Sequence, residues 1–212
     1  MNGGPRCPDE LARKIGHEFA RPELLEIALT HVSAAASAAE SYERLEFLGD
    51  RVLGLVIADL LMRRHPEEKE GDLARRLAGL VARDGLVEIA DTLDLGAWLR
   101  LSAGEHAAGM RDNRSVLADV MEAVIGAVYR DGGLAAAAPL IERLWAPLAE
   151  RDIRPPHYRV LEKTGPDHQP VFIVEVTVDG AVPVRGEGSS KRAAEQAAAE
   201  GLLPILKGPD DR

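Results

Sequence analysis

Apolar runs with helical spacing dominate the first 150 residues of the chain. Two of these runs, 43–61 and 116–129, lack proline and are rich in Leu, Ile and Val, which is typical of buried helices. Further helices are predicted at 9–16, 22–31, 73–93 and 134–148. Asp72 is the expected N-cap of the third of these, and Gly132-Gly133 predicts a sharp break before the fourth. This part of the chain is therefore expected to be all-α.

The pattern changes near residue 150, where charged residues and two adjacent prolines predict a linker. Asp179-Gly180 predicts a hairpin turn within an alternating apolar and polar pattern that is typical of strands. Strands are expected at 158–163, 171–178 and 183–187, with an alanine-rich helix at 189–206. The chain is thus expected to be multidomain, with an all-α domain at 1–149, a linker at 150–156 and a small α+β domain at 157–208.

Composition narrows the class of protein and its compartment. The 212 residues suffice for one large or two modest domains, and the low aromatic content of 4% favours a helical core of Leu, Val, Ile and Ala. A single cysteine, Cys7, excludes an internal disulfide and fits the cytoplasm. No stretch is expected to span a membrane. The net charge of -9 counts against nucleic acid, so phosphate contacts would need local basic patches.

Acidic residues interrupt both apolar helices at regular intervals. Glu43, Glu46 and Asp50 fall on one helical face because a helix turns by about 100° per residue, and Asp119 and Glu122 share a face in the same way. Carboxylates among apolar residues need a cation, and hard oxygen ligands suit Mg²⁺ or Mn²⁺. Two such ions can clamp the attacking and leaving oxygens of a phosphodiester. The alternative is that these acids are solvated or cap a helix.

The sequence ERLEFLGD at 43–50 resembles, residue for residue, the signature motif of the ribonuclease III family. Leu117-Ala118-Asp119 with Glu122-Ala123 resembles its second acidic motif, and Leu29-Thr30-His31 with Ser33 resembles a segment that precedes the signature. The resemblance implies an all-α catalytic domain that cleaves double-stranded RNA, leaves 5′-phosphate and 3′-hydroxyl ends, and processes ribosomal and other structured RNA precursors. It also implies a homodimer formed through the signature helix.

The same resemblance implies a metal site. Glu46, Asp119 and Glu122 are expected to hold the ion that activates water, with Glu122 as the indispensable ligand. Mg²⁺ is the expected ion and Mn²⁺ a possible substitute, whereas no small-molecule cofactor is expected.

A second group of acids completes the expected site. Glu43, Asp50 and Glu70 are expected to bind a second ion or to order its waters, which makes Asp50 a catalytic residue together with Glu122. Glu70 could instead belong to a solvated acidic turn. For His31, we expect a packed and hydrogen-bonded side chain without a catalytic role.

The C-terminal part resembles a double-stranded RNA-binding domain. Gly165-Pro166-Asp167-His168 resembles the loop that reaches a minor groove, and the stretch 188–195 resembles the start of the final helix, which holds phosphates. The residues expected to contact RNA are Gly165, Pro166, His168, Ser190, Lys191 and Arg192. Glu195 stands where family members often carry a third basic residue, which should weaken phosphate contact.

The first helix of such a domain has no place in this chain. In the family it packs on the sheet and supplies one of three RNA contact regions, but the interval between Trp145 and Tyr158 is too short for it. Trp145 itself is expected to pack on the catalytic domain. The second domain is therefore predicted to have the order β-β-β-α.

Two other functions remain open at this point. All-α nucleotide pyrophosphohydrolases also bind magnesium through ExxE-type helical acids, although a small nucleotide needs no RNA-binding tail. A catalytically silent protein that binds double-stranded RNA is the second alternative, although it would be free to lose the acids.

Overall fold

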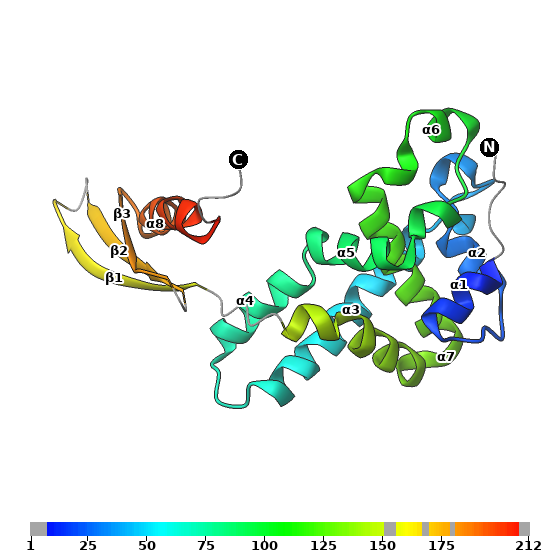
Figure 1. The fold of residues 1–212 in the computed structure, drawn as a ribbon, viewed down its shortest axis with the longest axis horizontal. Coiled ribbons are helices and arrows are strands. Elements are labelled where there is room, and N and C mark those ends of the chain that lie inside the picture. Colours follow the sequence, from blue (N-terminus) through cyan, green and yellow to red (C-terminus); the bar gives the residue numbers. More distant parts are fainter. Residues whose placement is uncertain (1–7, 151–155, 167–169, 179–180, 208–212) are drawn as a thin grey trace. The chain divides into compact units, whose positions relative to one another are not determined.

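The computed structural model of the chain describes residues 8–150, 156–166, 170–178 and 181–207. Its contacts divide the chain into two compact units, Met1–Asp152 and Ile153–Arg212. Figure 1 shows that the first unit consists of helices and that the second consists of a small sheet with one helix on it. The division between the units falls within the segment where the sequence predicts a linker.

The first unit is built from seven α-helices within its described residues. They are α1 (Pro8–Ile15), α2 (Glu23–Ala28), α3 (Glu43–Arg64), α4 (Glu70–Leu80), α5 (Arg83–Leu93), α6 (Ala103–Ala107) and α7 (Arg114–Glu150). Helices α3 and α7 pack against each other at the centre, and Leu53 and Ile57 of α3 and Val124 of α7 are fully buried. The signature stretch and the second acidic stretch therefore lie on the two central helices.

Helix α7 contains the break predicted at Gly132-Gly133. Gly133 has φ 68° and ψ −167°, which lies outside the helical region, so the helix consists of two arms. Contrary to the expectation from the sequence, α7 is long and apolar enough to cross a membrane by length and composition. In this fold its first arm is a core helix, since Val120 and Ile125 have no exposed surface.

The single helix predicted at 73–93 is wrong. Helix α4 begins at Glu70 with Lys69 at the N-cap position, so Asp72 lies in the first turn and does not cap it. Ala82 is extended and separates α4 from α5. The indole Nε1–H of the buried Trp145 donates to the carbonyl oxygen of Leu80 at 2.9 Å, which satisfies that carbonyl without another helical turn. The burial of Trp145 confirms its predicted packing on the helical domain.

The second unit has the predicted order β-β-β-α. Its elements are β1 (His157–Thr164), β2 (Val171–Thr177), β3 (Val184–Gly188) and α8 (Lys191–Lys207), and the sheet is antiparallel in the order β1-β2-β3. A Cβ atom on Gly186 would collide with the backbone nitrogen of Ala198, so α8 rests directly on β3.

The face of β1 on the α8 side is left open. Val160 pairs with the fully buried Val174 and so lies on the same face of the sheet, yet 41% of Val160 is exposed. Within the described residues of this unit, no helix precedes β1. The small core of this unit is therefore uncovered on the flank where the first helix of the family would pack.

Candidate active site

Two glycines bring the acidic stretches of α3 and α7 together. A Cβ atom on Gly49 would collide with the carbonyl oxygen of Glu122, and one on Gly126 would collide with the carbonyl oxygen of Leu45. The backbones of the two helices therefore touch, which only glycine permits at these positions. Because Glu122 takes part in this contact, its side chain emerges beside the acidic face of α3.

Three partly buried carboxylates from the two helices influence one another. Burial, followed by the charges of Glu46 and Asp119, raises the pKa of Glu122 to about 7. Burial and the charges of Asp119 and Glu43 raise the pKa of Glu46, and burial raises the pKa of Asp119. The structure thus gathers Glu43, Glu46, Asp119 and Glu122 into one electrostatic cluster.

The other two predicted acids do not belong to this cluster. Asp50 forms an ion pair with Arg51 and keeps 40% of its side chain exposed. Glu70 is the exposed first residue of α4. Neither residue is among the charges that shift the pKa values of Glu46, Asp119 and Glu122.

The carboxylates are not drawn together as metal ligands would be. Among the described residues, no group of three or more His, Cys, Asp or Glu side chains lies close enough to hold a metal ion. The donor set nevertheless fits a divalent ion, because it offers partly buried carboxylate oxygens, the hard ligands that such ions prefer.

Two further side chains next to the cluster were not predicted from the sequence. Tyr42 is buried at the start of α3, and burial together with Asp119, Glu46 and Glu43 raises its pKa to about 12, so its hydroxyl stays neutral. Arg51 opposes the rise in the pKa of Glu122. Both residues adjoin predicted acids in the sequence, and that adjacency is the signal that could have identified them.

His31 is packed and hydrogen-bonded in the structure. Its Nδ1 accepts a hydrogen bond from the backbone N–H of Ser33 at 3.2 Å, and Nδ1 also lies 2.9 Å from the Ser33 hydroxyl. The ring is tilted against Tyr42 at a centroid distance of 5.8 Å. These contacts agree with the structural role expected for His31.

Three of the residues predicted to bind RNA lie at the start of α8. Ser190 Oγ accepts a hydrogen bond from the backbone N–H of Ala193 at 3.1 Å and so caps the helix. Lys191 lies 3.7 Å from Glu195, whose carboxylate competes with phosphate for the same ammonium group. Arg192 is exposed. The RNA contacts of these residues stay predictions.

The other predicted RNA contacts precede β2. Gly165 adopts φ 86° and is exposed, as is Pro166. His168 lies outside the described residues. A contact between this loop and a minor groove also stays a prediction.

We expect the metal-free protein to lose stability as the pH rises from about 5 to about 8. The folded-state pKa of Glu122 lies above its value of 4.5 in the unfolded chain, so its contribution is present below pH 4.5 and is lost as the pH passes about 7. After discounting for solvent screening, the loss is roughly 1 to 2 kcal/mol. Thermal unfolding in EDTA measures it. The Glu122→Gln variant should have a flatter profile, and an identical profile would contradict the assignment.

Comparisons with known proteins agree with this architecture. Residues 21–148 match the family described as Ribonuclease-III-like, and residues 143–205 match the double-stranded RNA binding motif. Ribonuclease 3 of Nitrobacter winogradskyi is 45% identical over 91% of this chain and 81% of its own length. Ribonuclease 3 of Caulobacter vibrioides is 45% identical over 92% of this chain and 94% of its own.

A solved structure supports the same relationship for the helical unit. The nuclease domain of ribonuclease III from Campylobacter jejuni matches with a TM-score of 0.64 and 36% identity, covering 66% of this chain and 97% of that domain. The predicted fold class, a helical catalytic domain followed by a small RNA-binding domain, is therefore confirmed. The chain belongs to the ribonuclease III family, the metal-dependent endoribonucleases that cleave double-stranded RNA.

Proposed function

We propose that Glu46, Asp119 and Glu122 hold a Mg²⁺ ion, for which Mn²⁺ can substitute. The observation that carries this proposal is the close backbone contact of α3 and α7, which brings partly buried carboxylates of both helices together, where burial raises the pKa of each. A bound divalent ion supplies Lewis-acid assistance and lowers the pKa of water, so that hydrolysis proceeds at neutral pH.

The surrounding residues orient the reacting groups in this proposal. Glu122 acts mainly in its ionised form, because protonation would remove the charge that attracts the ion. Asp50 orders water at the catalytic centre once it releases Arg51, and Glu43 and Glu70 support a second ion. The neutral hydroxyl of Tyr42 can donate a hydrogen bond to a neighbouring carboxylate. Hydrolysis of the phosphodiester leaves 5′-phosphate and 3′-hydroxyl ends.

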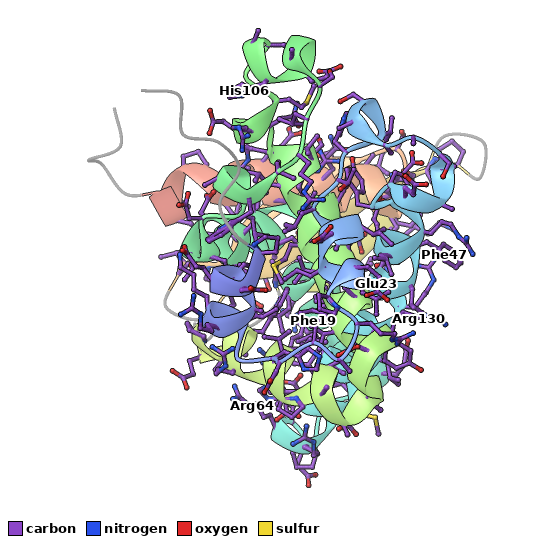
Figure 2. All side chains as sticks on the ribbon, turned by 90° about the vertical axis from the view of Figure 1, so that its right-hand side faces the viewer. Phe19, Glu23, Phe47, Arg64, His106 and Arg130 are labelled. Atoms are coloured by element: carbon purple, nitrogen blue, oxygen red, sulfur yellow. The ribbon has the colours of Figure 1, made fainter. Side chains whose placement is uncertain are left out.

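A homodimer through α3 is part of the proposal. Phe47, Leu55 and Met62 are 66%, 58% and 64% exposed and recur on one face of the helix. Figure 2 shows Phe47 at the outer edge of the helical unit, pointing away from it. An exposed apolar stripe of this kind marks an association surface. The Campylobacter jejuni nuclease domain is described as structurally flexible in a region involved in dimer formation. Analytical ultracentrifugation of the full chain measures this association.

The proposed biological role is the processing of ribosomal and other structured RNA precursors in the cytoplasm. The single cysteine fits a reducing compartment, and the double-stranded RNA binding motif provides for a duplex substrate. Recognition should depend on A-form shape and 2′-hydroxyl groups rather than on base sequence.

Cleavage of a perfectly paired RNA duplex by the full chain with Mg²⁺ tests this function. We expect the duplex to be cut and a single strand of the same sequence to remain intact. Deletion of residues 151–212 should raise the KM by about tenfold or more at moderate salt, with a steeper loss at higher salt, because phosphate contacts disappear.

Each alternative function predicts a different result. Binding of the duplex without cutting, by a folded protein, would indicate a silent RNA-binding protein. Hydrolysis of nucleoside triphosphates at a rate that the deletion leaves unchanged would indicate a pyrophosphohydrolase.

A further inference from the structure

Several arginines of α3, α4 and α7 are engaged by carboxylates of the protein itself. Their ion pairs are Arg51–Asp50, Arg75–Asp72, Arg76–Glu68 and Arg114–Asp84. An RNA backbone that approaches a cluster of carboxylates meets electrostatic repulsion, which a metal ion offsets only in part. A cationic side chain without an ion-pair partner beside this site would therefore be able to bind the RNA backbone.

Arg83 is such a cation. It is the exposed first residue of α5, and it has no hydrogen bond or ion pair with any residue in the described part of the chain. Its neighbour Asp84 accepts a hydrogen bond from Nη2 of Arg114 at 2.8 Å, which ties the first turn of α5 to the first residue of α7. Asp119 follows little more than one turn later in α7.

The charge of Arg83 also reaches the site. Among the charged groups around Asp119, the guanidinium of Arg83 is the one that opposes the rise in its pKa. Arg83 nevertheless forms no ion pair with Asp119, so its hydrogen-bond donors stay available. A guanidinium group presents paired N–H donors that match a phosphate in bidentate geometry.

We propose that Arg83 is a substrate-positioning residue whose guanidinium binds a phosphate of the RNA backbone next to the bond that is cleaved. This inference rests on the proposed active site at Asp119. In this arrangement Arg83 holds a phosphate beside the acidic cluster and so fixes the register of the strand across the α3–α7 contact.

Duplex binding measured over a range of salt concentrations tests the proposal. Arg83→Gln, made in a Glu122→Gln background that keeps the RNA intact, should weaken binding of a paired RNA duplex about tenfold at low salt. The slope of log K against log salt should fall by about one unit, because one phosphate contact is lost. In the active enzyme the same change should raise KM and leave kcat nearly constant.

Arg130→Gln is the matched control. Arg130 is an exposed arginine eleven residues beyond Asp119 on α7, and its side chain forms no ion pair among the described residues (Figure 2). The Arg130→Gln variant should leave the affinity for the duplex and the salt slope unchanged. Arg83→Lys should keep the wild-type slope and recover part of the affinity that Arg83→Gln loses. An unchanged slope in Arg83→Gln, an equal loss in Arg130→Gln, or a loss confined to kcat would overturn the proposal. Because binding is measured without cleavage, failure of the proposed nuclease activity would appear separately, as an intact duplex in the wild-type reaction.

Discussion

The Glu122→Gln variant is expected to lose cleavage of duplex RNA by about a thousandfold or more while it retains duplex binding. The amide keeps the shape of the side chain but removes the charge that attracts a divalent ion. Loss of a metal-bound pathway removes several kcal/mol of transition-state stabilisation, and about 4 kcal/mol corresponds to roughly a thousandfold in rate. Single-turnover cleavage of a labelled duplex measures the rate, and titration calorimetry with Mg²⁺ or Mn²⁺ measures the metal affinity.

Glu23→Gln provides the control for the loss of a carboxylate. Glu23 is an exposed residue of α2, distant in the sequence from both acidic stretches and labelled in Figure 2. The Glu23→Gln variant should cleave duplex RNA at the wild-type rate and bind the same amount of metal as the wild type. The metal site would have to be assigned elsewhere if Glu122→Gln bound Mg²⁺ as tightly as the wild type and still cut RNA.

The second large effect is expected from Gly49→Ala, which should destabilise the helical unit by about 3 kcal/mol and abolish cleavage. Alanine favours a helix over glycine by about 1 kcal/mol, but its Cβ atom would collide with the carbonyl oxygen of Glu122. Backbone atoms cannot yield by changing a rotamer, so the helices must separate at a cost above that of ordinary overpacking. Chemical denaturation of the full chain measures the change.

Gly79→Ala tests whether the effect depends on the contact. Gly79 lies in α4, and a Cβ atom built on it meets no atom within 4 Å. This variant should be as stable as the wild type or up to about 1 kcal/mol more stable. Equal destabilisation of the two variants would contradict the role assigned to the α3–α7 contact.

Local patterns of residues in the sequence were sufficient to predict most of the helices and strands. The helix α3 follows from an apolar run without proline, and the sheet follows from the alternation of apolar and polar residues. The predicted turn at Asp179-Gly180 lies outside the described residues. The pair Gly132-Gly133 located the break in α7 because a positive φ is cheap only for glycine. These features depend on neighbours within a few residues, so the chain specifies them without tertiary information.

The division of the 73–93 stretch could not be predicted in this way. Its residues favour one helix, but Trp145 takes the carbonyl of Leu80 from a position 65 residues away in the sequence. A hydrogen bond to a distant side chain leaves no periodic trace in the local sequence. A tertiary contact therefore ends α4 at a point where helix propensity alone would have continued the helix.

Part of the candidate site could likewise be predicted from the sequence, and part of it depends on the tertiary structure. The sequence by itself determined that Glu43, Glu46, Asp119 and Glu122 share helical faces, because the angular period of a helix is fixed. Only the tertiary structure decided that the two acidic faces meet and that an unpaired arginine stands beside them. Those features depend on which backbones approach and which charges find partners, and such contacts form only when distant segments fold together.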